Sequence, residues 1–136
     1  MAETAQALTQ ALPLHVQLIQ MGTAYWVSRV VYAAAKLGLA DQLAAGPRSA
    51  AELAGATRTH APSLHRLMRT LASLGVLTED AGHSFALTPL GDALKSGAPG
   101  SARATILALA GDYWWRGWGE FLHCLETGQT GSNPHS

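Results

Sequence analysis

The segment from Leu14 to Leu37 constrains the fold most strongly. It contains no proline and a single glycine, Gly22, so we expect one long helix over residues 14–37. Apolar side chains form two stripes along this helix: Ile19, Trp26, Val30, Ala33 and Leu37 in the first, and Val16, Val27, Val31 and Ala34 in the second. Because a helix that is apolar on two sides needs two surfaces to pack against, we expect the chain's own domain to supply one and a partner chain the other.

The composition favours one compact domain and gives no sign of a nucleic-acid or membrane partner. Of 136 residues, 48% are hydrophobic and 13% are charged, and nine basic residues balance nine acidic ones. The single cysteine, Cys124, excludes an intrachain disulfide. No signal peptide is recognisable in residues 1–13, and no apolar run approaches the ~20 residues of a membrane span. We therefore expect a cytoplasmic protein.

Residues 38–97 show the order of elements found in a winged helix. A short helix is closed by Gly46-Pro47, and Ser49 with Glu52 forms a capping box for the next helix. A further helix runs from Pro62 to Leu74 and ends at Gly75. The strand candidates "VLTED" and "SFALT" flank the turn "DAGH", and "TPLGDALKSG" indicates another short helix. This order predicts a winged helix with a small β-hairpin.

The remaining segments complete a mainly α fold. We expect a flexible arm at residues 1–13, a helical pair at residues 102–127 that meets near Gly111-Asp112, and a disordered tail at residues 129–136. Trp114, Trp115 and Trp118 lie close together in this pair. They can belong to an ordinary core, or to an interface or the wall of an apolar ligand pocket.

The sequence predicts no catalytic, cofactor-binding or metal-binding residue. His60 and His65 are five residues apart and would point in different directions on a helix, and His123 with Cys124 has no second pair of ligands. A nucleophile motif of the type G-x-S-x-G and a glycine-rich phosphate loop are both missing.

A DNA-binding transcription regulator is the alternative function. Arg66 and Arg69 fall on the outward side of the helix over residues 62–74, where they could contact phosphate or guanine. However, the expected wing carries Glu79 and Asp80, which would repel phosphate. We therefore regard nucleic acid as the less favoured partner.

Several motifs resemble the N-terminal dimerisation domain of S-adenosylmethionine-dependent O-methyltransferases. The group includes plant caffeic acid-type enzymes and bacterial enzymes that act on aromatic polyketides. The resemblance covers roughly residues 14–128, and its most specific pieces are "AAKLGLADQL", "THAPSLHRLMRTLASLGV", "FALTPLGDAL" and "WRGWGEFLHCLETG".

This resemblance implies a homodimer in which the winged helix does not bind DNA. The long first helix would reach toward the partner's substrate pocket, which takes a hydrophobic aromatic small molecule in the full-length enzyme. Carried onto this sequence, the pocket-facing positions are Thr23, Trp26, Leu109 and Trp114.

The chain departs from the family after Gly128. The family continues into a Rossmann-like domain that binds S-adenosylmethionine and carries a catalytic histidine, whereas "QTGSNPHS" follows here. We therefore expect a fragment, a truncated or frameshifted product, or a stand-alone domain, without the catalytic domain and without methyl transfer of its own.

Overall fold

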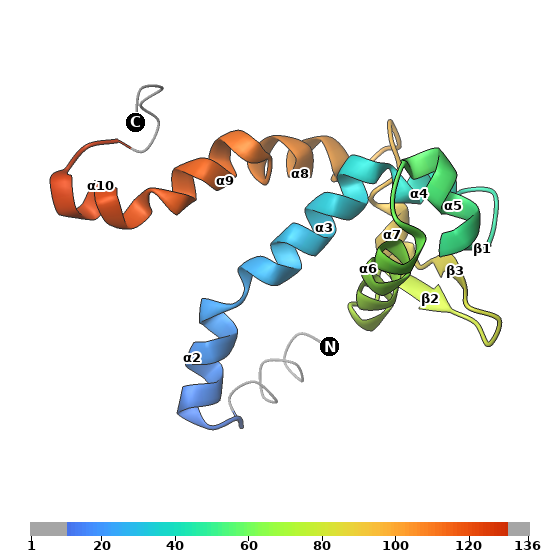
Figure 1. Ribbon diagram of the computed structural model, residues 1–136, viewed down its shortest axis with the longest axis horizontal. Coiled ribbons are helices and arrows are strands. Elements are labelled where there is room, and N and C mark those ends of the chain that lie inside the picture. The colour runs from blue at the N-terminus through green and yellow to red at the C-terminus, as the bar shows by residue number, and fades with distance from the viewer. Residues whose placement is uncertain (1–10, 131–136) are drawn as a thin grey trace.

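The computed structural model describes residues 11–130, so most of the predicted arm at residues 1–13 and of the predicted tail at residues 129–136 lies outside the described residues. The helices are α2 (Leu14–Gly22), α3 (Tyr25–Leu37), α4 (Leu39–Gln42), α5 (Ala50–Thr57), α6 (Ala61–Ser73), α7 (Pro89–Asp92), α8 (Arg103–Leu109), α9 (Asp112–Gly119) and α10 (Phe121–Thr127). The strands are β1 (Arg48–Ser49), β2 (Leu77–Glu79) and β3 (Ser84–Leu87). Figure 1 shows a lobe made of α4 to α7 and the sheet, with two helical arms leaving it.

The lobe is the predicted winged helix and contains the hydrophobic core. Its antiparallel sheet has the order β1-β3-β2, with Leu77 opposite Leu87 and Arg48 opposite Phe85. Helix α6 packs on α5 and on β2. The largest fully buried side chains come from α4, α5, α6 and β3: Leu39, Leu53, Met68, Leu71 and Phe85. Strand β1 is an addition to the predicted hairpin.

Local signals in the sequence form as expected. The Ser49 hydroxyl accepts a hydrogen bond from the Glu52 amide, and the Glu52 carboxylate accepts one from the Ser49 amide, both at 3.2 Å. These bonds satisfy donors that the start of α5 would otherwise leave free. At the end of α6, Gly75 takes the left-handed backbone (φ +79°) that favours glycine. The capping box and the helix stop are therefore confirmed.

The single helix predicted over residues 14–37 is wrong: it is interrupted at Thr23 and Ala24. Thr23 leaves the helical conformation (φ −110°, ψ 8°), and both its amide and its hydroxyl donate to the carbonyl of Ile19, the hydroxyl at 2.8 Å. A threonine hydroxyl that bonds to the carbonyl four residues back destabilises a helix and often bends it, and Gly22 weakens it further. Helices α2 and α3 therefore run in different directions (Figure 1).

The pair predicted at residues 102–127 is a series of three helices. The break at Gly111 is confirmed, and the position requires glycine, because a Cβ at this buried site would lie 2.5 Å from the carbonyl oxygen of Leu107. A second break follows at Glu120, after two glycines in the last turn of α9, Gly117 and Gly119. Because glycine is a poor helix former, this turn ends the helix before the apolar pattern does.

Polar contacts fasten α8 to the lobe. Arg103 donates from Nε to the carbonyl of Ala35 (2.8 Å) and from Nη1 to the Ser96 hydroxyl (3.1 Å). The Asp41 carboxylate accepts hydrogen bonds from the Ser96 hydroxyl and from the Ser96 amide (2.9 Å). The hydrogen bonds from the Ser96 side chain and amide lower the pKa of Asp41, and the charges of Arg103 and Lys95 act in the same direction.

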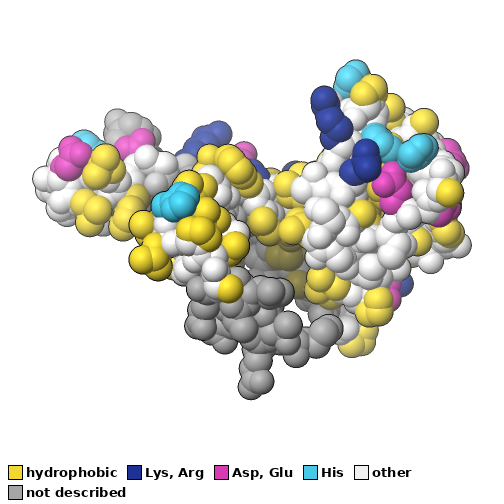
Figure 2. All heavy atoms as spheres, turned by 90° about the horizontal axis from the view of Figure 1, so that it is seen from below, with side chains coloured by type: hydrophobic (Ala, Val, Ile, Leu, Met, Phe, Trp, Pro, Cys, Tyr) yellow, Lys and Arg dark blue, Asp and Glu magenta, His cyan; other side chains and the backbone are white. Residues whose placement is uncertain are grey.

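The arms, which we define as α2 with the first half of α3 and α8 to α10, differ from the lobe in burial. Helices α2, α9 and α10 contain no buried residue. Their exposed large hydrophobic side chains are Leu14, Leu18, Ile19, Met21, Tyr113, Trp114, Trp115, Trp118, Phe121, Leu122 and Leu125. Figure 2 shows hydrophobic side chains gathered over the arms. Within residues 11–130, no helix combines the length and the apolar character that crossing a membrane requires.

Candidate functional site

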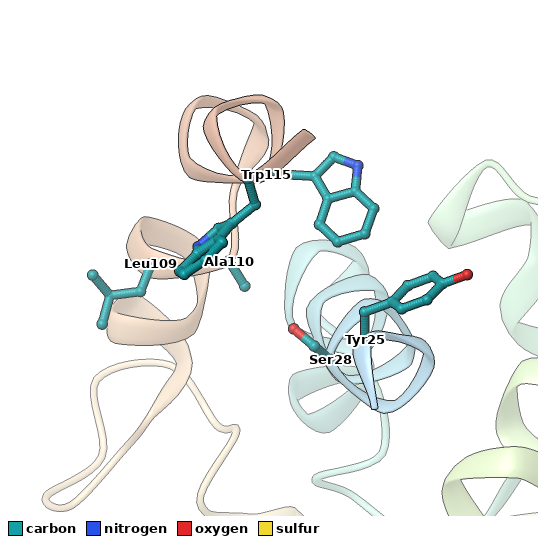
Figure 3. A pocket seen from close by; sticks show the side chains of 6 residues that line it. Tyr25, Ser28, Leu109, Ala110 and Trp115 are labelled. Carbon is teal, nitrogen blue, oxygen red and sulfur yellow. The ribbon is translucent and has the colours of Figure 1, made fainter. Parts of the chain in front are cut away.

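An open apolar hollow lies where the two arms meet. It has a volume of about 330 Å³ and is lined by Tyr25, Ser28, Leu109, Ala110, Trp115 and Trp118. Figure 3 shows Tyr25 and Ser28 on α3, with Leu109, Ala110 and Trp115 on the neighbouring α8–α9 region. Tyr25 and Trp115 approach each other with ring centroids 5.9 Å apart. A concave, mostly apolar surface with three aromatic rings and few polar groups suits a flat apolar molecule.

Arg29 holds the two sides of this hollow together. Its guanidinium lies over the ring of Trp115 (4.4 Å) and over the ring of Tyr32 (4.5 Å), and Nη1 donates to the carbonyl of Ala110 at 2.8 Å. The carbonyl bond uses one donor of the planar cation, while the ring faces attract its charge. Arg29 thus fixes α3 against the α8–α9 junction, and its contact with Trp115 orients that indole.

The four residues predicted to face a pocket do not gather in one place. Leu109 lines the hollow. Thr23 ends α2, Trp26 contacts Tyr25 edge to face (6.0 Å), and Trp114 contacts Tyr113 (5.4 Å). None of these three lines the hollow within one chain, and their role toward a partner's pocket stays a prediction.

Sequence reasoning missed three of the lining residues, Tyr25, Ser28 and Ala110. The sequence left Trp115 and Trp118 open between an ordinary core, an interface and a pocket wall, and both line the hollow. Tyr25 and Ser28 are three residues apart, so they share one face of α3. That spacing was the available signal for this side of the hollow.

The two arginines proposed for DNA contact have partners inside the lobe. Arg69 Nε lies 3.3 Å from Glu79 Oε1 of the wing, and Arg66 donates to the Ser63 hydroxyl at 3.3 Å. The carboxylate of Glu79 offsets the charge that Arg69 would offer to phosphate. Nothing in this geometry favours the regulator over the apolar hollow as the functional site.

Comparison with known proteins identifies relatives of this arrangement. The family model described as the O-methyltransferase dimerisation domain matches residues 16–97. The phenazine O-methyltransferase PhzM of Lysobacter antibioticus is 45% identical over 120 residues, which cover 88% of this chain and 35% of that protein. The chain therefore spans about a third of the length of this relative.

Solved structures of such proteins share the fold. The crystal structure of LaPhzM matches with a TM-score of 0.83 and 44% identity, covering 89% of this chain and 36% of that one. NcsB1, an O-methyltransferase from neocarzinostatin biosynthesis, was solved in complex with S-adenosylmethionine and 2-hydroxy-5-methyl naphthoic acid. It matches with a TM-score of 0.68 and 36% identity, over 78% of this chain and 33% of that one.

Proposed function

Because the chain belongs to the O-methyltransferase dimerisation-domain family, we propose that two copies of it associate through their arms. One observation carries the proposal: α2, α9 and α10 expose a series of large apolar side chains and bury none. A solvent-exposed patch of this kind on a folded domain is characteristic of an interface. The predicted homodimer gives this surface an occupant.

A second copy suits the arms better than an unrelated partner. Both arms leave the same lobe and present apolar side chains over several turns (Figures 1 and 2). In a symmetric dimer the same surface of each copy contacts the other, so an apolar face on one copy packs against an apolar face on the second. Fully burying each leucine, isoleucine or aromatic side chain contributes about 1.5–3 kcal/mol, which rewards the pairing of several at once.

The hollow at the meeting point of the arms would serve as one wall of an aromatic-substrate pocket. Its lining of Tyr25, Trp115, Trp118 and Leu109 suits a flat aromatic ring system, and Ser28 offers one polar group. The relatives named for phenazine methylation and solved with a naphthoic acid support this class of ligand. Thr23, Trp26 and Trp114 are exposed or half-buried on the adjoining arms, from which a partner's pocket could be reached.

The described residues do not fit the methyl donor. S-adenosylmethionine sites in the family belong to a Rossmann-like domain, whereas the strands here are short and antiparallel. The connections from β1 to α5 and from β3 to α7 are capped by Ser49 and Thr88, and neither is a glycine-rich turn. We therefore assign no step of methyl transfer to residues 11–130. The cytoplasmic location stays a prediction from the sequence.

Sedimentation equilibrium tests the dimer with a matched pair of variants. Ile19 on α2 is 60% exposed and Leu90 on the lobe is 59% exposed. We expect the wild-type chain at micromolar concentration to sediment with about twice its mass of 14.2 kDa. Ile19→Glu should raise the dissociation constant at least ~10-fold, because it removes ~1.5 kcal/mol or more of apolar burial.

The control variant tests whether the effect is specific to the arms or arises at any exposed apolar side chain. Leu90→Glu introduces the same charge at an equally exposed leucine outside the arms and should leave the dissociation constant unchanged. A wild-type chain that remains monomeric, or equal weakening by the two variants, contradicts the proposal.

A further inference from the structure

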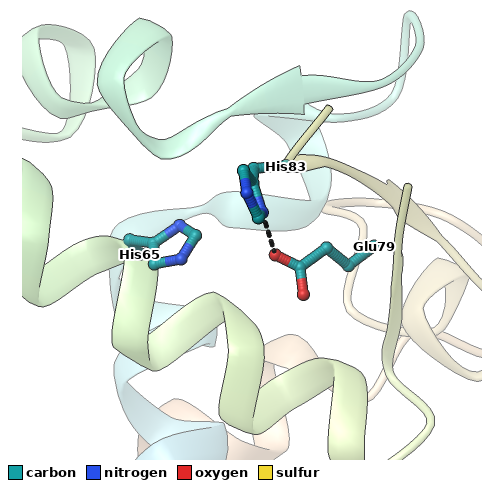
Figure 4. A group of neighbouring side chains, drawn as sticks. All are labelled: His65, Glu79 and His83. Atoms are coloured by element: carbon teal, nitrogen blue, oxygen red, sulfur yellow. Dashed lines mark hydrogen bonds and ion pairs between the residues drawn. The ribbon is translucent and has the colours of Figure 1, made fainter. Parts of the chain in front are cut away.

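Two histidines and a glutamate converge on the lobe, away from the arms and the hollow. His65 lies on α6, Glu79 ends β2, and His83 closes the turn before β3. One ligand atom from each of the three lies within 4.8 Å of the others. Figure 4 shows the three side chains pointing toward one another from these separate elements.

Each of the three side chains is held by contacts of its own. The ring of His65 packs edge to face on the buried Phe85 (5.7 Å), which fixes it against the core. Glu79 gives one carboxylate oxygen to Arg69 Nε (3.3 Å), and its other oxygen, Oε2, lies 3.2 Å from His83 Nδ1. Ligating carboxylates in metal sites are commonly held by a second hydrogen bond in this way.

The turn places His83 by an unusual backbone conformation. His83 has a left-handed φ of +62°. Asp80 stabilises the turn, since its Oδ1 accepts from the amides of Gly82 (2.9 Å) and Ser84 (3.0 Å). The imidazole thereby lies beside His65, with ring centroids 5.7 Å apart and planes at 82°.

We propose that His65, Glu79 and His83 bind one Zn²⁺ ion, with solvent as the fourth ligand. Imidazole nitrogen and carboxylate oxygen are ordinary Zn²⁺ ligands at about 2.0–2.2 Å, and two histidines with one glutamate are a known ligand set. Tetrahedral ligation needs ligand atoms about 3.4 Å apart. The ligand atoms lie within 4.8 Å of one another, so side-chain rotations that move them by up to about 1.4 Å bring the three groups to that spacing.

The bound ion would fasten the wing to α6. His65 belongs to the helix, whereas Glu79 and His83 belong to the hairpin, so one ion would join two elements that already meet by packing and by the Arg69 ion pair. Arg69 is ion-paired with Glu79 and lowers the affinity for Zn²⁺, but its contact is with Oε1 and leaves Oε2 directed at the cluster. The inference is independent of dimerisation and of any substrate.

Calorimetric titration of ZnCl₂ into the full chain, prepared without a histidine tag, tests the site. We expect one equivalent to bind per chain, and His83→Asn to weaken binding at least ~10-fold. Asparagine tolerates the left-handed backbone, and the His83 side chain is 70% exposed, so this variant keeps the turn. His60→Gln is the matched control, because His60 lies at the start of α6 and contacts Ser63 instead of the cluster.

Thermal unfolding gives a second reading of the same site. Saturating Zn²⁺ should raise Tm by several degrees in the wild-type chain and in His60→Gln, and leave His83→Asn unchanged. Absence of binding by the wild-type chain overturns the proposal. Equal affinity in the wild-type chain and His83→Asn also overturns it, since the ion would then be bound by other histidines.

Discussion

The lobe and the arms both contain many large apolar residues but use them in opposite ways. In the lobe, Leu53, Met68, Leu71 and Phe85 are completely buried. In the arms, Ile19, Trp118 and Phe121 are at least half exposed, although their side chains are as large. The lobe therefore removes its large apolar side chains from water within one chain, whereas the arms leave theirs in contact with solvent.

This difference separates the two roles that apolar sequence can have. Apolar stripes on two sides of a helix indicate that it packs against two surfaces. Residues 14–37 carry such stripes, even though they form two helices instead of one. Helix α6 has a single apolar stripe, which packs on α5 and on the hairpin and so forms the core of the lobe. Dimerisation would complete for the arms what the lobe achieves alone.

The largest expected effect comes from exchanging one phenylalanine in each region. Phe85 in β3 is 0% exposed and Phe121 in α10 is 50% exposed. Phe85→Ala should lower the free energy of unfolding by about 3–5 kcal/mol, because it leaves a cavity in the core. Phe121→Ala should change it by less than ~0.5 kcal/mol in urea titrations at dilutions where the chain is monomeric. Equal losses in the two variants would remove the distinction between lobe and arms.

A smaller effect is expected at the bend that sets the direction of the C-terminal arm. Gly111→Ala would bring a methyl group against the Leu107 carbonyl, so it should cost about 1–3 kcal/mol and shift tryptophan emission from the arm. Gly117→Ala is the opposite case, because nothing lies within 4 Å of its Cβ position in α9. It should stabilise the helix by about 0.5–1 kcal/mol. Stabilisation by both alanines, measured by thermal and urea unfolding, would show that the bend is not sterically fixed.

The smallest effect concerns Asp41, which joins the lobe to the C-terminal arm through Ser96. Because its pKa is lowered from the ordinary value of 3.8 in the folded chain, its carboxylate stabilises folding above that pH, and this contribution is lost as the pH falls through the folded-state pKa. Asp41→Asn should lower the free energy of unfolding by at most about 1 kcal/mol near neutral pH, because solvent screens this exposed carboxylate, and the difference from wild type should shrink as the pH falls below 3.8.

Asp92→Asn is the control for losing one negative charge. Asp92 pairs with Lys95 at 3.0 Å on the surface of the lobe. A pair of this kind contributes about 0–1 kcal/mol, so the variant should lie close to wild type. A difference between Asp41→Asn and wild type that is constant from pH 7 to pH 3 would contradict the account of Asp41.

The parts of the fold that the sequence predicts are those set by neighbours in the chain. Ser49 with Glu52, Thr88 before Pro89, and Gly75 after α6 act within one turn, so their residue types determine the local backbone. The winged helix follows from their order. Strand β1 escapes this reasoning, because two residues carry no strand pattern and their pairing with β3 is set by packing.

The candidate sites were harder to predict because they join distant segments. Arg29 meets Ala110 across 81 positions, and His65 meets Glu79 and His83 only because α6 packs on β2. Spacing along the chain compares residues within one element, such as His60 and His65. It cannot identify ligands that lie on different elements. The helix breaks at Thr23 and Glu120 were also not predicted, because the apolar periodicity continues across both.

Hydrogen–deuterium exchange measured at several protein concentrations tests the central claim, that a second copy covers the arms, most directly. We expect amides of α2, α9 and α10 to become more protected as concentration rises through the dimer dissociation constant, while those of α5 and α6 stay equally protected throughout. Protection of the arms that is the same at every concentration would contradict the claim.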